Sequence, residues 1–500
     1  MRKGGLSLFI WVKIHYNKSA WKGEFVLKPY DLIVVGAGPA GIFAAYEYTQ
    51  LMPEAKVLVI EKGLDLDKRH CPILDKRVKA CPVNGEGYAG CYPACSISSG
   101  FGGAGAYSDG KFNITSEFGG WLTLYRSEAE VMDLIHAVDA INLAHGAPND
   151  LTDPFTPHVR AIERRGYGVG LKLLRAKVRH LGTEENIKIL RNIRNTLASR
   201  VEFRFKTVVA DLMVDQQQIQ GVCLESGEMI PSRRVFVAPG REGTAWFEGV
   251  LRKHKVDLIN NQVDIGVRVE TNNVVMEEIN ETLYEGKFLF NATVGTQVRT
   301  FCSNPSGHVV IENQNGVMMV NGHAFRDPKL GSANTNFALL VSHAFSEPFR
   351  DPNRFASEIA RLANQLTMGS VIVQKYGDIL KGRRTTEKRL AEGFVHPTLI
   401  EAVPGDLGLV LPYNTMKSII EMIEALNHIT PGIASEHTLL YGVEAKFYSA
   451  RPEINRNFET TIKGLYVGGD GAGLTRGLAQ AGANGVAVAR AIHEEEMHHE

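Results

Sequence analysis

The sequence has no excess of charge of either sign. Its 55 Lys and Arg side chains are balanced by 55 Asp and Glu side chains, so its formal net charge is zero. A strongly basic surface, which would favour nucleic acid or an anionic membrane as a partner, is therefore not predicted. No apolar run approaches the roughly 18 residues that a membrane-spanning helix needs. We predict neither a nucleic-acid partner nor a membrane span.

Cysteine is also scarce, with 6 residues in 500. Secreted disulfide frameworks occur mainly in short, cysteine-rich chains, so a reducing cytoplasm is the predicted location. The apolar stretch Leu6–Val12 follows basic residues, but it ends at Lys13 and no small-residue cleavage site follows, which disfavours a secretory signal. Residues 1–29 are interpreted as an N-terminal extension.

Glycine, in contrast, is abundant. The chain has 50 glycines in 500 residues, against a usual share of roughly 7%. This excess indicates that much of the backbone lies close to other groups. The length is too great for a single hydrophobic core, so two or more domains are predicted.

The strongest motif lies in residues 30–63, which read YDLIVVGAGPAGIFAAYEYTQLMPEAKVLVIEKG. Residues 32–35 and 57–60 are predicted to be buried strands, and residues 42–49 a helix between them. A glycine-rich turn follows the first strand and precedes the helix. This order of elements is typical of a unit that binds a dinucleotide.

Each glycine of the turn has a separate predicted role. Gly36 allows a tight turn, Gly38 lets a pyrophosphate approach the backbone, and Gly41 lets the helix pack on the sheet. The phosphates then meet the positive end of the helix dipole. Pro39 and Ala40 complete this part of the predicted cofactor site.

Glu61 ends the second predicted strand, where its carboxylate can accept hydrogen bonds from the adenosine ribose. Lys62 follows it and is included in the site. The similar glycine pattern in GEGYAG, residues 85–90, has no strand before it and is interpreted as a loop.

A second glycine-rich turn lies near the C-terminus. Residues 465–467 are a predicted strand that runs into Gly-Gly-Asp, and residues 478–492 a predicted helix of small side chains. The pair of motifs resembles the flavoprotein superfamily that includes glutathione reductase, para-hydroxybenzoate hydroxylase and geranylgeranyl reductase. The resemblance implies FAD as the cofactor, with the first motif holding its ADP half.

The second motif carries residues that the resemblance assigns to the rest of the cofactor. Asp470, preceded by Gly469, would bind the ribityl hydroxyls. The backbone at the start of the following helix would face the pyrimidine end of the flavin ring. This implied contact comprises Gln480, Ala481, Gly482 and Asn484.

The segment 201–243 is predicted to return to the same cofactor. A strand at 203–209, a hairpin through DQQQIQG and a buried strand at 235–238 are expected. In the superfamily the strand corresponding to Val208 runs beside the adenine. The second strand ends in Ala-Pro-Gly, a departure from the Ala-Thr-Gly of the superfamily that keeps the turn at Gly240.

Four further blocks resemble a group of bacterial and archaeal FAD-dependent dehydrogenases whose reactions are mostly unassigned. The blocks are GFGGAGAYSDGK, VDIGVRVE, VRTFCSNPSGHVV and ANTNFALLV. In the first block, glycines without Cβ atoms let amide N–H groups reach phosphate or ring atoms. Gly102, Gly103 and Ala104 are therefore predicted to contact the cofactor.

Four of the cysteines are clustered. The intervals between Cys71, Cys81, Cys91 and Cys95 are nine, nine and three residues, which differ from the usual pairs of a zinc or iron–sulfur site. A metal site, a redox pair that passes electrons to the flavin and plain reduced thiols all stay open. No metal site is predicted.

The predicted fold class is α/β, with a Rossmann-like FAD domain that has a central parallel sheet and a β-meander, and a mixed-sheet substrate domain. The FAD domain is predicted to be discontinuous. It comprises 30–165, 200–245 and 435–500, with a Cys- and Gly-rich insertion at 65–120, a helical segment at 168–200 and a substrate domain at 246–434.

The resemblance implies an oxidoreductase that transfers hydride between flavin N5 and a small organic substrate. A flavin monooxygenase and a non-enzymatic redox sensor are the alternatives. The substrate domain contains no dinucleotide-binding motif of its own that would hold NAD(P)H, so NAD(P)H bound transiently, a ferredoxin-type carrier and the substrate itself remain as electron donors. No catalytic residue is assigned, although six side chains of suitable chemistry occur: Cys302, His308, His323, Glu444, Lys446 and Arg451. The oligomeric state is not predicted.

Overall fold

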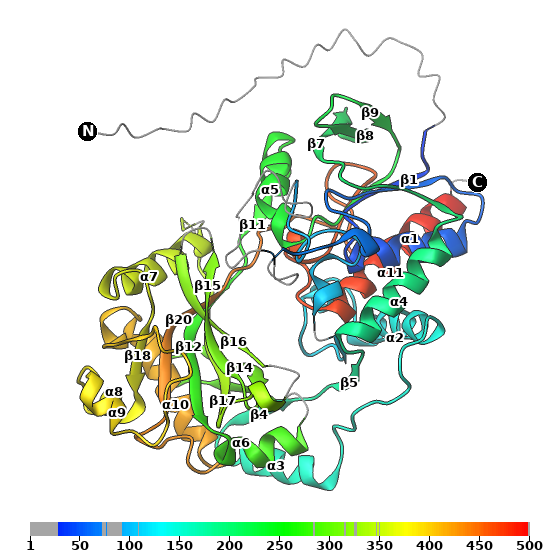
Figure 1. Ribbon diagram of the computed structural model, residues 1–500. Helices are drawn as coiled ribbons and strands as arrows, with labels where there is room; N and C mark the ends of the chain where they lie inside the picture. The colour runs from blue at the N-terminus through cyan, green and yellow to red at the C-terminus, as the bar shows by residue number, and fades with distance from the viewer. Residues whose placement is uncertain are drawn as a thin grey trace, which may run out of the picture.

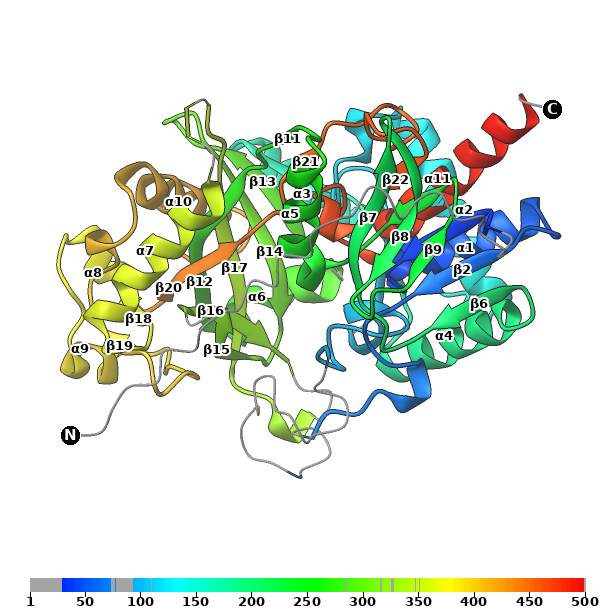
Figure 2. The same cartoon turned by 90° about the horizontal axis from the view of Figure 1, so that it is seen from above.

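The protein folds into two lobes that lie side by side (Figures 1 and 2). The computed structural model describes residues 29–72, 77, 93–108, 110–283, 286–314, 317–324, 328–346, 348–349 and 351–498. One lobe contains both ends of the described chain, and the other is built mainly from its middle part. The predictions for residues 1–28, for the loop 85–90 and for Cys81 and Cys91 lie outside the described residues.

The first lobe is built on a five-stranded parallel sheet. The strand order is β22 (Leu465–Val467), β10 (Val235–Val237), β1 (Leu32–Val35), β2 (Val57–Ile60) and β6 (Val201–Arg204). Strands β1, β2, β10 and β22 are apolar and buried at every residue, as expected of a parallel sheet covered on both faces. The predicted Rossmann-like parallel sheet is confirmed, and it joins segments from three distant parts of the chain.

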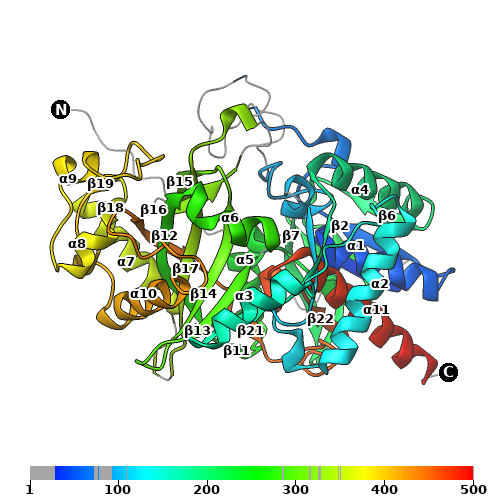
Figure 3. The same ribbon diagram turned by 90° about the horizontal axis from the view of Figure 1, so that it is seen from below.

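Helices from both ends of the chain pack together on this sheet. They are α1 (Pro39–Leu51), which begins before and ends after the predicted helix, and α11 (Leu478–Met497). A Cβ atom placed on Gly485 of α11 would lie 2.0 Å from the carbonyl oxygen of Ala40 in α1, so the two backbones nearly touch. The blue and red helices lie side by side in Figures 1 and 3. Two further helices complete this lobe: α2 (Glu128–Ala144) and α4 (Thr183–Leu197).

Smaller sheets surround the parallel sheet. The predicted meander is the antiparallel sheet of β7 (Val209–Asp215), β8 (Gln218–Leu224) and β9 (Met229–Pro231). The hairpin between β7 and β8 turns at Gln216 and Gln217, which both have positive φ. The remaining small elements are β3 (Lys111–Ile114) with β5 (Lys177–His180), β11 (Leu258–Ile259) with β21 (Arg451–Pro452), and α5 (Thr244–Lys253).

The second lobe is built on an eight-stranded mixed sheet. Its order is β19 (Val403–Pro404), β18 (Ile372–Lys375), β20 (Leu439–Lys446), β12 (Val263–Asn272), β17 (Asn334–His343), β14 (Gln297–Asn304), β13 (Lys287–Asn291) and β4 (Leu171–Leu174). Its neighbouring strands are antiparallel except β18 and β19. The mixed sheet predicted for the second domain is thus present.

A separate hairpin and several helices pack around this sheet (Figures 2 and 3). The hairpin is formed by β15 (His308–Gln314) and β16 (Val317–His323). The helices are α3 (Pro157–Tyr167), α6 (Asn273–Thr282), α7 (Pro352–Leu366), α8 (Tyr376–Leu380), α9 (Glu387–Ala391) and α10 (Tyr413–Leu426).

The central strand β12 has one apolar face and one charged face. Its odd-numbered residues from 263 to 269 belong to the apolar core that also contains side chains of α6 and α10. The opposite face carries Asp264, Arg268 and Glu270, all buried. Arg268 donates two hydrogen bonds of 2.8 Å to the carboxylate of Glu444 on β20. Charges buried in this way are tolerated because each has a charged or hydrogen-bonding partner.

Two predicted domain boundaries differ from the structure. Residues 439–446, predicted in the FAD domain, form β20 of the eight-stranded sheet because they pair with β12 and β18. The predicted helical segment 168–200 contains helix α4, but it begins with two short strands. The first of these, β4, pairs with β13, and the second, β5, pairs with β3. Both differences arise from pairing with strands that are distant in the sequence.

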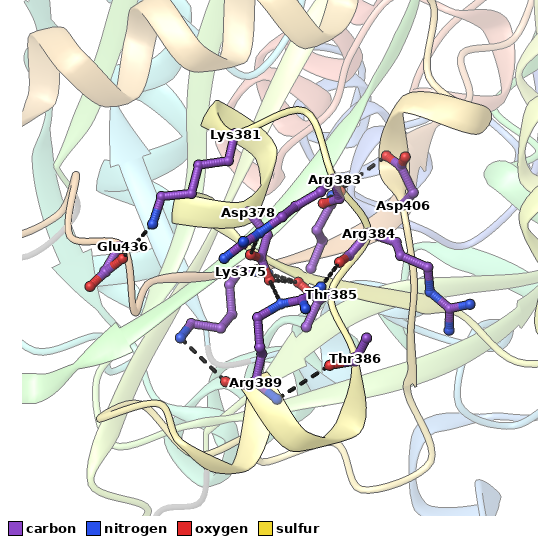
Figure 4. A network of polar contacts seen from close by, with 11 residues as sticks. Lys375, Asp378, Lys381, Arg383, Arg384, Thr385, Thr386, Arg389, Asp406 and Glu436 are labelled. Carbon is purple, nitrogen blue, oxygen red and sulfur yellow. Dashed lines mark hydrogen bonds and ion pairs between the residues drawn. The ribbon is translucent and has the colours of Figure 1, made fainter.

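A polar network fixes the segment between α8 and α9 (Figure 4). The carboxylate of Asp378 is only 3% exposed, and it accepts hydrogen bonds from Arg383 Nε at 2.7 Å, Thr385 Oγ1 at 2.8 Å and Arg389 Nε at 3.1 Å. Burial opposes ionisation of this group. The three donors outweigh burial and lower the pKa of Asp378 below its usual value.

Replacement of Asp378 by asparagine is expected to lower the free energy of unfolding at pH 7 by about 1–3 kcal/mol, because it removes an ionised acceptor from charged donors. The depressed pKa means that the native carboxylate stabilises the fold above its unfolded pKa of about 3.9 and loses this effect as pH falls through the folded pKa. The free energy of unfolding of Asp378→Asn should therefore fall less steeply than that of the parent protein as the pH is lowered from 7 to 3, as measured by chemical denaturation. Glu436→Gln, which removes the exposed carboxylate beside Lys381 and His437, should change little.

Candidate cofactor site

The turn after β1 has the geometry of a phosphate-binding turn. Gly36 has a φ of +104°, and a Cβ atom on it would lie 2.2 Å from the carbonyl oxygen of Ala238. A Cβ atom on Gly41 would lie 1.9 Å from the carbonyl oxygen of Gly36. By contrast, nothing lies within 4 Å of the Cβ position of Gly38. The turn is thus closed against the protein at two glycines and open at the third.

The N-terminus of α1 also lacks the side-chain cap that a helix start usually has. The helix begins at Pro39, its N-cap is Gly38, no side chain caps it and its first turn holds no acidic residue. Free N–H groups at such a helix start attract an anion. Together with the open space at Gly38, this end of α1 fits a pyrophosphate.

Glu61 is held by backbone amides on both sides of the turn. Its Oε2 accepts from Ala37 N at 2.8 Å, and its Oε1 accepts from Gly63 N at 2.8 Å and Gly100 N at 3.0 Å. A carboxylate offers about four acceptor positions, so Oε2 retains one for a ribose hydroxyl. The adjacent Lys62 pairs with Glu242 at 3.2 Å.

The glycine-rich loop of the first block lies against the same turn. Gly102 N donates to Ala37 O at 2.8 Å, and a Cβ atom on Gly103 would lie 3.1 Å from the Cα atom of Gly38. Both Gly102 and Gly103 have positive φ, at +88° and +57°. Ala104 follows in the short 3₁₀ helix Gly103–Tyr107. The predicted segment is therefore brought to the open side of Gly38.

Arg69 holds this loop in place, a role that the sequence did not indicate. Its side chain is 3% exposed, and its guanidinium donates to Ser96 O at 2.8 Å, Phe101 O at 2.7 Å and Ile97 O at 2.9 Å. It also lies 4.8 Å from the centre of the Tyr107 ring. Burial lowers the pKa of Arg69 from its usual value. Three carbonyl oxygens thus accept the hydrogen bonds that water would accept from an exposed guanidinium.

The C-terminal motif meets the first turn from the other side. A Cβ atom on Gly469 would lie 3.5 Å from the Cβ atom of Ala40. Asp470 follows, and its Oδ1 accepts from Thr475 Oγ1 at 2.8 Å. Its second carboxylate oxygen has no hydrogen bond within the described residues. Glu61 thus contacts the turn at Ala37, and the segment that carries Asp470 contacts the start of α1 at Ala40.

Two buried amide groups on α11 have one polar atom each without a partner among the described residues. Gln480 Nε2 donates to Phe118 O at 3.0 Å, which leaves Gln480 Oε1 unpaired. Asn484 Oδ1 accepts from Gly469 N at 2.9 Å, which leaves Asn484 Nδ2 unpaired. They are two of nine buried side-chain atoms that have no hydrogen-bond partner within the described residues. Ala481 and Gly482 lie between them and are buried.

The remaining predicted residues lie at the two flanks of the turn. Val208 immediately precedes β7, and the amide of its neighbour Thr207 donates to Glu61 O at 3.1 Å, so Val208 lies close to Glu61. Gly240 has a φ of +63° and open space at its Cβ position, while a Cβ atom on Gly471 would lie 2.3 Å from its carbonyl oxygen. Ala-Pro-Gly thus keeps the turn despite the altered residue.

Comparison with known proteins relates the second lobe to flavoproteins. Residues 262–447 match a family described as FAD-dependent protein, C-terminal domain-like. The match confirms the predicted cofactor, FAD. It begins just before β12 and ends just after β20.

Relatives of the whole chain are more distant. A protein of Clostridium beijerinckii, named only as uncharacterized, is 27% identical over 485 residues, which are 92% of this chain and 80% of the relative. Similar solved structures include E. coli quinol fumarate reductase (16% identity, 95% of this chain and 71% of that chain, TM-score 0.39) and Geobacillus kaustophilus glycine oxidase (13% identity, 94% of this chain and 95% of that chain, TM-score 0.36). Both structural likenesses are distant.

The other side chains singled out in the sequence have separate environments. Cys71 and Cys95 are free thiols, and within the described residues no group of three or more His, Cys, Asp or Glu side chains could hold a metal ion. His308 and His323 face each other across the β15–β16 hairpin. No helix of the described residues is long and apolar enough to cross a membrane.

Proposed function

We propose that the protein is an FAD-dependent oxidoreductase that acts on a small organic substrate. The observation that carries this proposal is the glycine turn after β1, which is open at Gly38 and leads into the uncapped start of α1, together with the match of residues 262–447 to an FAD-dependent family. When bound, FAD supplies hydride chemistry at N5, with one partner oxidised by two electrons and the other reduced.

The residues of the chain would bind and orient this cofactor. Gly38 and the start of α1 would hold the pyrophosphate, Glu61 the ribose near Val208, and Asp470 the ribityl chain. The loop at Gly102–Ala104 would cover the open side of the turn, and it would exclude water from the cofactor there. The helix start of α11 would place Gln480 and Asn484 at the ring.

Substitutions at the turn test this proposal. Gly38→Trp should fill the only open position of the turn and lower FAD content at least tenfold. Asp470→Ala should lower it less, because only one group of hydrogen bonds is lost. The content is measured as flavin absorbance per mole of protein after release by heat. Gly249→Trp and Asp67→Ala, at an open helix position and an exposed carboxylate, are the controls.

Full FAD content in both site variants would contradict the proposed cofactor site.

The electron donor is identified by anaerobic titration of the bound flavin with NADH, NADPH and reduced ferredoxin, followed at the flavin absorption bands. Bleaching by one of them supports an oxidoreductase with that donor. Coupled oxygen consumption and hydroxylated product would indicate a monooxygenase instead, and no bleaching by any donor would favour a redox sensor.

A further inference from the structure

The two lobes meet beside the start of α11. Arg476 N donates to Gly119 O at 2.8 Å, and Trp121 N donates to Leu474 O at 2.9 Å. The ring of Trp121 packs edge-on against the ring of Tyr448, with centroids 5.0 Å apart. Tyr448 follows β20 of the second lobe. The junction is therefore fixed by backbone contacts on one side and by an aromatic pair across the two lobes.

Two cations lie at this junction without a carboxylate partner. Lys446 Nζ lies 3.8 Å from the centre of the Phe301 ring. The guanidinium of Arg476 lies 4.4 Å from the centre of the Tyr448 ring and donates from Nη2 to Phe447 O at 2.6 Å. Neither side chain forms an ion pair within the described residues, and both are partly exposed. Four of the five N–H groups of Arg476 thus have no protein acceptor there.

The neighbouring acids are already neutralised. Asp264 pairs with Arg299 at 3.2 Å, and it accepts further hydrogen bonds from Ser342 Oγ and the Tyr448 hydroxyl. Glu444 is held by the bidentate contact with Arg268 described above. Each acid thus has its own arginine. Lys446 and Arg476 are therefore positive charges of the junction that no carboxylate neutralises within the described residues.

Two neighbouring positive charges without a carboxylate are unfavourable unless an anion neutralises them. Burial lowers the pKa of Lys446, and the nearby Arg476 and Arg268 act in the same direction, while Cys302 and Glu444 oppose them. An aromatic ring covers one side of each cation, which reduces its contact with water and strengthens the attraction of an anion. The same rings offer apolar surface to the carbon skeleton of a ligand.

We propose that Lys446 and Arg476 bind the carboxylate of a small organic acid, which is the substrate of the flavin site. A carboxylate matches the planar fork of a guanidinium with two parallel hydrogen bonds, whereas Lys446 contributes a point charge. The inference rests on the proposed function, because Arg476 lies just before helix α11, whose first turn carries Gln480, the residue proposed to meet the flavin ring. The substrate thereby sits between the two lobes, with Phe301, Tyr448 and Trp121 around it.

Binding of simple carboxylates tests the inference. The as-purified protein is titrated with acetate, succinate and benzoate by calorimetry and by difference absorption of bound flavin, at constant ionic strength, with phosphate and chloride as comparison anions. At least one carboxylate is expected to bind saturably. Lys446→Met and Arg476→Met should each raise its dissociation constant by about tenfold or more. Lys381→Met and Arg165→Met, which alter exposed ion pairs elsewhere, should leave it unchanged.

The outcomes separate this inference from the proposed function. Absence of FAD from the protein contradicts the proposed function, while calorimetry still reports on the anion. FAD present with no carboxylate binding, or binding unaffected in both variants, overturns the carboxylate site. Saturable binding of phosphate alone overturns the choice of carboxylate. Unchanged anion binding with a lowered flavin midpoint potential in both variants would assign the two cations to the flavin, and it would also overturn the proposal.

Discussion

Gly485→Ala is expected to lower the free energy of unfolding of the first lobe by about 1–3 kcal/mol and to release most of the bound FAD. The added methyl group would lie 2.0 Å from the Ala40 carbonyl oxygen, and both atoms belong to rigid helix backbones. Relief requires α11 to move away from α1. That movement displaces the adjacent Asn484, whose amide holds Gly469, and so disturbs the cofactor site at the same time.

The matched control is Gly249→Ala in helix α5. No atom lies within 4 Å of the Cβ position of Gly249, so the methyl group enters open space. Because alanine is favoured over glycine inside a helix, this variant should be as stable as the parent or up to about 1 kcal/mol more stable. Denaturant unfolding followed by circular dichroism, with flavin fluorescence as a second signal, compares the two. Equal behaviour of both variants would show that α1 and α11 are not in close contact.

The strands around the glycine turn were predictable from the sequence because glycine and short apolar runs carry direct backbone information. The strands at 32–35, 57–60 and 465–467 agree with β1, β2 and β22 residue for residue. Each is an unbroken apolar run that ends at a polar residue or a glycine, as parallel buried strands require. The predicted strand 203–209 was less accurate. It is divided into β6 and β7 by residues 205–208, where Lys206 has a positive φ.

The remainder could not be predicted because it depends on contacts between distant segments. The short strands β4 and β5 have no length or periodicity of their own, and they are strands because β13 and β3 pair with them. The junction of Arg476 with Tyr448 exists only once the lobes dock. Which of several cations lacks an acid cannot be read from a chain of zero net charge. Arg268 has a carboxylate partner in the folded protein, whereas Lys446 has none within the described residues, and only the folded structure shows this difference.

Arg69→Met is the second variant with a large expected effect. It leaves the carbonyl oxygens of Ser96, Ile97 and Phe101 without their donor inside the protein. Each unpaired buried acceptor costs about 1–3 kcal/mol, so the loop is expected to detach and the free energy of unfolding to fall by about 3 kcal/mol or more. Arg69→Lys keeps the charge but not the planar fork, and its effect should be intermediate.

The decisive readout is the dissociation constant of FAD, measured by adding FAD to protein whose flavin has been removed, at a temperature where circular dichroism shows both variants folded. A loop that packs against Gly38 through Gly102 and Gly103 should bind FAD at least tenfold more weakly once Arg69 is lost. Arg191→Met removes only an exposed ion pair with Asp67 on the same segment and should bind FAD normally. Normal FAD affinity in a folded Arg69→Met variant would mean that the loop does not contribute to the cofactor site. In that case Arg69 would stabilise only the fold, and the open side of the glycine turn would be covered by another part of the chain.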